Sequence, residues 1–266
     1  MQPLIFARME IAGYIASVFI GFMLGLTGGG GSVLTVPILV YLFKVEPVVA
    51  TAYSLFVVGT TSLVGGVKAY THNHVDFMAL SMFGIPSIFT IFISRHFILP
   101  ELPDVILGLS KGSFLMLVFA ALMLITAAYM IKPRIETTAT QTTGNYKPLS
   151  LLLPGLLLGL ITGLLGAGGG FLIIPALVII LKLPMRKAIG TSLLIIAINS
   201  TFGVLFTLKL FKFQWGFLVL MSLLAVIGVL IGSWYSTKLN NQQLRKFFGL
   251  FVLVMAVYIV VRELFL

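Results

Sequence analysis

Two long uncharged stretches, each broken by a run of glycines, limit what this chain can fold into. Residues 11–43 and 148–181 contain no Asp, Glu, Lys or Arg over 33 and 34 positions. A membrane-spanning helix needs about 20 apolar residues, so each stretch is too long for one helix and too short for two full spans. The glycines fall in the middle, at 28–31 and within 166–170. Each stretch is therefore predicted to form one span followed by a short helix of half-membrane depth.

The composition supports the same class of protein. Hydrophobic residues make up 59% of the chain and charged residues 9%, whereas soluble domains carry about 25% charged residues. This balance excludes a water-soluble enzyme and a disordered chain, and the long apolar runs lack the alternation of barrel strands. We therefore expect an all-α polytopic protein of the cytoplasmic membrane. The remaining predicted apolar segments are 47–67, 77–94, 112–131, 188–208, 213–237 and 247–261.

The chain is an internal duplication at a fixed offset of 138 residues. Without gaps, 16 of 45 positions are identical between residues 21–65 and 159–203. The identities include Gly28 with Gly166, Pro37 with Pro175 and Ser54 with Ser192, which apolar composition alone does not align. We predict two homologous membrane halves, each with about five apolar segments, one of them short and preceded by a glycine break. The boundaries expected are 1–131 for the first half, 132–149 for the linker and 150–266 for the second half.

The orientation of the halves depends on how many segments cross the membrane. Five crossings per half would invert the second half relative to the first, whereas re-entrant short segments would leave four crossings and parallel halves. Five crossings place ten Lys and Arg on one side and seven on the other, against nine and eight for four crossings. Because basic residues gather on the cytoplasmic side, the distribution favours inverted halves with both termini outside.

Paired glycine breaks inside apolar stretches favour a binding site. A glycine-rich turn at a helix N-terminus presents free backbone N–H groups and the positive end of the helix dipole to an anion. In lipid, such non-helical backbone survives only inside protein or beside a wet cavity. The alternative is close helix packing by small residues. Neither run continues as the Gly-Lys-Ser/Thr of a nucleotide loop.

Small hydroxyls and one amide form a second group of candidates on residues 47–67 and 188–208. Ser54 and Ser62 are eight residues apart, as are Ser192 and Ser200, so each pair shares a helix face. Such groups bind an oxyanion or bond to neighbouring backbone and helices. The complete predicted substrate-binding set is Gly28, Gly29, Gly30, Gly31, Ser32, Ser54, Ser62, Gly166, Gly168, Gly169, Gly170, Thr191, Ser192, Asn199 and Ser200.

The residue types that are missing restrict the chemistry further. The chain has no cysteine, and none of its seven acidic residues falls in the middle of a predicted span, which disfavours cation transport and carboxylate proton relays. His72 and His74, near Asp76, are expected to be interfacial loop residues. We predict no enzyme activity, no catalytic or metal site and no cofactor. The net charge of +10 comes from scattered Lys and Arg, which serve topology or attract an anion rather than nucleic acid.

Several stretches resemble one known family. Residues 25–40 (GLTGGGGSVLTVPILV), 163–178 (GLLGAGGGFLIIPALV), 186–194 (RKAIGTSLL) and the closing 238–258 are similar to the TauE/SafE sulfite exporter family. The resemblance implies movement of sulfite, organosulfonates or related small anions across the cytoplasmic membrane, mostly outward. We therefore expect a secondary-type exporter whose partners are a small anion and the lipid bilayer. The alternatives are a channel-like anion pore and a transporter of another small oxyanion or carboxylate; homo-oligomerisation stays open.

Overall fold

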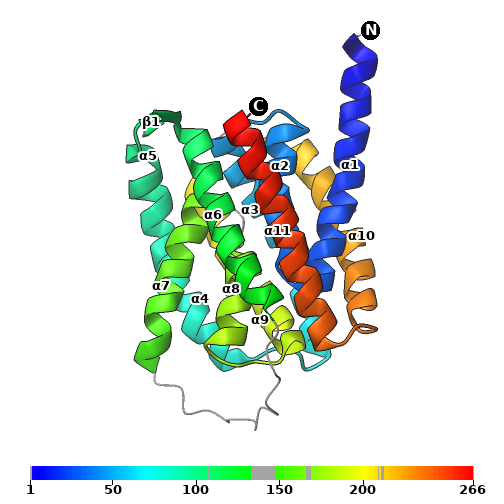
Figure 1. The fold of residues 1–266 in the computed structure, drawn as a ribbon, viewed down its shortest axis with the longest axis vertical. Coiled ribbons are helices and arrows are strands. Elements are labelled where there is room, and N and C mark those ends of the chain that lie inside the picture. The colour runs from blue at the N-terminus through cyan, green and yellow to red at the C-terminus, as the bar shows by residue number, and fades with distance from the viewer. Residues whose placement is uncertain are drawn as a thin grey trace.

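The protein is an all-helical bundle apart from one short hairpin, as the computed structural model shows (Figure 1). The structure describes residues 2–106, 108–132, 148–165, 169–208, 210 and 213–265. The elements of the first half are α1 (Gln2–Thr27), α2 (Gly30–Tyr41), α3 (Pro47–Thr71), α4 (Phe77–Ile93), the π-helical turn η1 (Ser94–Ile98), α5 (Leu99–Glu101), β1 (Val105–Ile106), β2 (Leu109–Ser110) and α6 (Lys111–Ile131). Those of the second half are α7 (Pro148–Leu165), α8 (Gly170–Ile179), α9 (Met185–Thr207), α10 (Trp215–Ser236) and α11 (Asn241–Phe265).

The helices confirm a polytopic membrane protein. In the described part of the chain, six helices are long and apolar enough to span a membrane, three in each half. Each half also has the predicted short helix after its glycine break. At 1.5 Å per residue, the 12 residues of α2 and the 10 of α8 reach about 18 and 15 Å, roughly half of a 30 Å hydrocarbon core.

The helix before each glycine break forms a hairpin with the short helix after it. α1 has 26 residues and α7 has 18, which correspond to about 39 and 27 Å at 1.5 Å per residue. Figure 1 shows α1 and α2 as a hairpin that starts and ends at the upper end of the body, with its turn inside. The α7–α8 hairpin enters in the same way from the lower end. We call the upper end, where α1 begins and α11 ends, the termini end, and the lower end, where α6 ends and α7 begins, the linker end.

The centre of the bundle is the crossing of α3 with its repeat counterpart α9. A Cβ added to Gly65 would lie 3.2 Å from Leu193, and one added to Gly203 would lie 2.8 Å from Leu55. These two contacts are equivalent at the repeat offset, so the crossing is close to symmetric. Residues later in α3 contact residues earlier in α9, so the two helices run antiparallel. This course is the one that inverted halves require.

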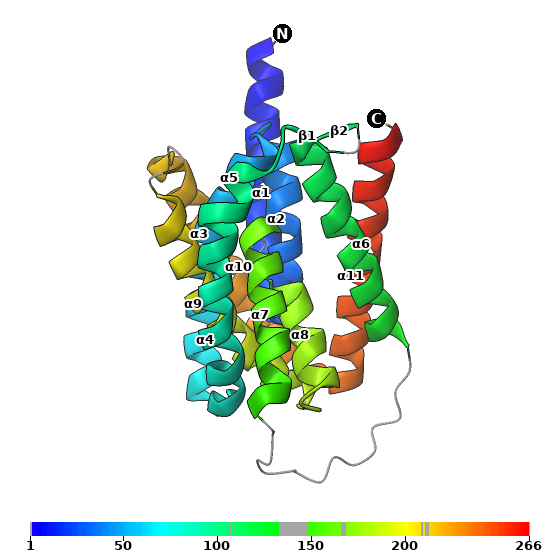
Figure 2. The ribbon, with the colours of Figure 1, turned by 90° about the vertical axis from the view of Figure 1, so that its left-hand side faces the viewer.

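The first helix of each half packs against the fourth helix of the other half. A Cβ at Gly21 of α1 would overlap the carbonyl of Ala225 in α10, and one at Gly159 of α7 would overlap the carbonyl of Ser87 in α4. Figure 2 shows α4 beside α7, and α6 beside α11. Because the partners come from different halves, neither half forms its packing surface alone.

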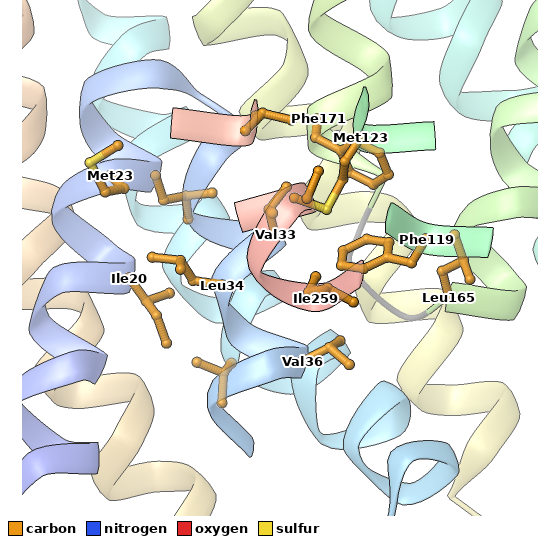
Figure 3. Packing of buried hydrophobic residues seen from close by; sticks show 14 of the residues in the cluster. Ile20, Met23, Val33, Leu34, Val36, Phe119, Met123, Leu165, Phe171 and Ile259 are labelled. Atoms are coloured by element: carbon orange, nitrogen blue, oxygen red, sulfur yellow. The ribbon is translucent and has the colours of Figure 1, made fainter. Parts of the chain in front are cut away.

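The buried core wraps the half-depth helices. Side chains from several helices meet around α2 in Figure 3, among them Ile20 of α1, Val33 of α2, Phe119 of α6, Phe171 of α8 and Ile259 of α11. The rings of Phe119 and Phe171 pack edge to face at 5.1 Å. The outer surface is also apolar, which is the pattern of a protein that faces lipid. Side chains more than half exposed include Ile85, Phe89, Leu153 and Leu223.

Glycines at the helix crossings are expected to carry much of the packing. Gly228→Ala on α10 places a methyl group on the Val18 carbonyl of α1, so the helices must separate at a cost of about 1–3 kcal/mol. Gly216→Ala on the same helix is the matched control, since a Cβ there meets nothing within 4 Å. We expect a lower melting temperature in detergent for Gly228→Ala alone. Equal melting temperatures would contradict this packing.

Candidate functional site

The glycine turns of the two halves touch each other inside the bundle. α2 begins after Gly29, and α8 begins after Gly169. A Cβ added to Gly29 would overlap the carbonyl oxygen of Gly170, and one added to Gly170 would lie 2.8 Å from the Cα of Gly29. The two turns therefore pack backbone against backbone, with no room for a side chain between them.

This contact brings two helix N-termini together. The first turn of any helix leaves backbone N–H groups without intrahelical partners, and the helix dipole adds about half a positive charge at that end. Two such ends face one place in the protein from opposite directions. The arrangement favours a bound anion, which would accept the N–H groups of both helices and offset the two dipoles.

Left-handed backbone explains part of the glycine pattern. Gly28 has φ +76° and Gly169 has φ +69°, a region that residues with a side chain rarely adopt. Gly31 serves packing, because a Cβ there would overlap the Ile20 carbonyl of α1. Gly30 lies in the first turn of α2. The predicted Gly166 and Gly168 lie outside the described residues.

Two of the predicted serines lie at the turns. The Ser32 hydroxyl donates to the Gly29 carbonyl at 2.6 Å, and a Cβ on Gly170 would lie 3.2 Å from the same hydroxyl. The Ser192 hydroxyl lies within bonding distance of the carbonyls of Gly28, at 3.1 Å, and Ile189, at 2.8 Å. Both hydroxyls hold the non-helical backbone in place and stand next to the contact between the halves.

Two further predicted hydroxyls bond to neighbouring backbone. Ser54 donates to the Thr51 carbonyl at 2.9 Å. Thr191 accepts the backbone N–H of Asp76 at 2.9 Å, where α4 begins. The structure thus gives these two side chains local bonding partners, and their predicted role in binding stays a prediction.

Three buried polar side chains near the α3–α9 crossing keep unused bonding capacity. Asn199 accepts a hydrogen bond from Ser87 at 2.7 Å, but its side-chain nitrogen has no partner. The hydroxyls of Ser62 and Ser200 are also buried without a partner. Buried polar groups normally find partners, so these three remain candidates for contact with a solute or water.

A basic cavity leads from the linker end toward the glycine turns. It has a volume of about 70 Å³ and lies between α1, α3, α9 and α10, which gives room for several waters at about 10–15 Å³ each. Lys68, His72, His74 and Arg186 line it, and no acidic residue does among the described ones. Ile189 also lines the cavity. It touches the first glycine turn, because a Cβ added to Gly28 would lie 2.8 Å from the Cα of Ile189. We call this cavity the vestibule.

Its electrostatics favour anions. Burial lowers the pKa of His74, and the positive charges of Arg186, His72 and Lys187 lower it further. The positive potential that disfavours protonation of His74 also attracts an anion to the vestibule. Arg186 is held by the carbonyls of Thr237 and Leu239, at 3.1 and 3.0 Å, so its charge is not cancelled by a carboxylate.

Sequence reasoning missed one residue, Arg95. Arg95 follows the predicted 77–94 segment directly, a place typical of a cation in a loop. In the structure the helix continues through η1, and Arg95 is 0% exposed. It donates to the Thr51 hydroxyl at 3.0 Å and contacts the Thr51 carbonyl at 3.4 Å, while its Nε has no partner. The available signal was a lone arginine at the end of an apolar segment.

Two of the acidic residues that the structure describes have structural contacts. Asp76 accepts the Ala79 backbone N–H at 2.9 Å and caps α4. Glu263 accepts the Tyr41 hydroxyl at 2.8 Å. In the described part of the chain no carboxylate reaches the glycine turns.

Comparisons with known proteins agree with this architecture. Residues 14–259 match the family described as sulfite exporter TauE/SafE. A probable membrane transporter protein of Xylella fastidiosa (strain Temecula1) is 30% identical, over 92% of this chain and 92% of the relative. A probable membrane transporter protein of Haemophilus influenzae is 26% identical over 89% and 92% of the two chains. The probable membrane transporter protein YunE of Bacillus subtilis is 25% identical over 91% and 89%.

No solved structure matches the fold. The sequence match nevertheless extends from α1 to α11 and includes both glycine turns and all six long apolar helices. This multi-pass membrane transporter therefore belongs to the sulfite exporter TauE/SafE family.

Proposed function

We propose that the protein is a secondary-type transporter that exports small oxyanions of the sulfite or organosulfonate class. The observation that carries the proposal is the meeting of two helix N-termini at the Gly29–Gly170 contact. Backbone N–H groups of α2 and α8 would bind the anion oxygens, with Ser32 and Ser192 beside them. This arrangement uses no buried charge at the site, so an anion can leave as well as enter.

The vestibule supplies the route to that site. Its basic residues raise the local concentration of anions at the linker end, and its inner wall at Ile189 adjoins the Gly28 turn. Inverted halves would place the linker end in the cytoplasm, which is where an exported anion enters. Exchange of conformation between the halves would then open the site toward the termini end.

A carrier fits the geometry better than the alternative, an anion channel. The backbone contact between Gly29 and Gly170 leaves no room for a side chain and therefore interrupts a continuous pore at this level. Counterflow in vesicles distinguishes the two: a carrier exchanges labelled sulfite for unlabelled sulfite with saturation, whereas a pore shows a flux that follows the gradient.

The glycine turns are expected to control affinity. Sulfite, sulfate, thiosulfate and sulfoacetate are each tested for a shift in the melting temperature of the purified protein, with chloride as reference. Gly29→Ala places a methyl group on the Gly170 carbonyl. We expect affinity for the stabilising anion to fall about tenfold to a hundredfold, since displaced backbone of this kind costs about 1–3 kcal/mol.

Gly228→Ala is the matched control, because it crowds α1 against α10 away from the turns. It should lower the melting temperature while anion affinity in the folded fraction stays at the wild-type value. If Gly29→Ala also lowers only the melting temperature, the turns serve helix packing and the proposed site is wrong.

The orientation of the chain can be tested with a single thiol, since the protein contains no cysteine. Under inverted halves with both termini outside, the 132–149 linker lies in the cytoplasm. Thr140→Cys should therefore react with a membrane-impermeant thiol reagent only after the cells are opened. A cysteine at Lys44, in the connection at the termini end, should react in intact cells. Reaction of Thr140→Cys from outside would reverse the assignment.

A further inference from the structure

Arg95 is a buried cation without a counter-charge. It is 0% exposed, and among the residues that the structure describes its hydrogen bonds reach only Thr51 and its Nε has no partner. In the described part of the chain no carboxylate pairs with it. Burial of an unpaired charge is costly, and in membrane proteins such residues mark solute pathways. Phe97, two residues further along the same helix, is 56% exposed. A side chain at this level can therefore reach the outer surface, but the side chain of Arg95 is buried in the bundle.

The repeat shows what Arg95 corresponds to in the other half. α4 with η1 covers Phe77–Ile98, and α10 covers Trp215–Ser236, the same bounds at the repeat offset. The packing is equivalent as well. A Cβ on Gly25 would meet Val229 of α10, and a Cβ on Gly163 would meet Ile91 of α4. On this mapping Arg95 is the counterpart of Ser233, and Thr51 is the counterpart of Ile189.

Both counterparts line the vestibule at the linker end. Arg95 and Thr51 therefore occupy the equivalent place at the termini end, where the structure is closed. Thr51 is 3% exposed and bonded to Arg95. The cavity beside Thr51 has a volume of about 10 Å³, which holds about one water and no oxyanion.

The two ends differ in charge as well as in shape. Lys68 and Arg186 of the vestibule map onto Phe206 and Val48 at the termini end. Lys68 and Arg186 thus have apolar counterparts, and the neutral Ser233 corresponds to a buried arginine. His74 maps onto Lys212, which lies outside the described residues. Among the mapped positions that the structure describes, Arg95 is the cation of the termini end.

We infer that Arg95 and Thr51 form a second oxyanion-binding station, which closes the termini end in this conformation and binds the anion when that end opens. The inference rests on the proposed function and adds a site outside the glycine turns. A guanidinium presents its N–H groups as a planar fork that fits two oxygens of a carboxylate, sulfite or sulfonate. In the closed conformation the two terminal nitrogens of Arg95 donate to the hydroxyl and the carbonyl of Thr51. The Nε, which has no partner among the described residues, is left to bind the anion.

The test compares variants at this station in proteoliposomes loaded with sulfite. Arg95→Gln removes the charge and retains hydrogen-bonding groups, and Arg95→Lys retains the charge without the planar fork. We expect Arg95→Gln to raise the half-saturating sulfite concentration by about tenfold or more, with a smaller rise for Arg95→Lys. Lys44→Gln, which removes an exposed cation in the 42–46 connection, should match the wild type.

The melting temperature separates binding from a structural role. Removing an unpaired buried charge should leave the melting temperature of Arg95→Gln equal to or above the wild-type value. A lower melting temperature with unchanged half-saturation in the folded protein would overturn the inference. Wild-type protein that neither transports nor binds any of the tested anions would instead overturn the proposed function.

Thiol accessibility gives a second measurement that keeps Arg95 intact. Ile189→Cys and Thr51→Cys place single thiols at equivalent positions of the two halves. Ile189→Cys should react with an impermeant reagent from the linker end without substrate. Thr51→Cys should react from the termini end, and faster during sulfite turnover than at rest. A Thr51→Cys thiol that never reacts from the termini end, in protein that transports sulfite, would overturn the inference.

Discussion

The contact between Gly29 and Gly170 depends on a constraint that the bilayer imposes on every polypeptide. Backbone N–H and C=O groups have no water to bond with in hydrocarbon, so a broken helix must be enclosed by protein. Here each half supplies the enclosure for the other: the turn after α1 meets the turn before α8, and α3 and α9 cross beside them. Contacts between the two halves also occur at the periphery, where α1 packs on α10 and α7 packs on α4. Each break is thus enclosed in part by the other half, which links the duplication to the glycine turns.

The enclosed turns have an electrostatic consequence. Two helix starts that face each other attract negative charge without any basic side chain at the contact. The cations stand further out, in the vestibule at one end and as Arg95 at the other. The proposed central site is neutral and lies between charged ends, which would suit a transporter, because strong charge attraction at the centre would hold the anion rather than release it. The conformation described here is open toward the linker end and closed at Arg95 and Thr51.

Near-symmetry makes the differences between the halves informative. The glycine contacts at Gly65 and Gly203 repeat almost contact for contact. Several residues that line the two ends do not repeat, since Ser233 corresponds to Arg95 and Lys68 to Phe206. The packing glycines Gly65 and Gly203 are thus equivalent in the two halves, whereas Arg95 and Ser233, at matched positions of the two ends, differ in charge and size.

The sequence by itself determined the class of the fold, the duplication and the short helix after each glycine break, because apolar runs and in-register glycines are properties of the chain alone. It also placed Ser32 next to a turn, since Ser32 directly follows the glycine run at 28–31, whereas the contact of Ser192 with Gly28 joins residues 164 positions apart and came only from the tertiary structure. Only the tertiary structure decided that α1 and α7 form hairpins with α2 and α8, that Thr191 bonds the start of α4, and that the two turns meet. The same holds for Arg95: a residue at the end of an apolar segment can face the interface or the core with equal local preference. Packing of η1 against α7 and α9 chooses the core, and such contacts join residues far apart in the chain that no local pattern encodes.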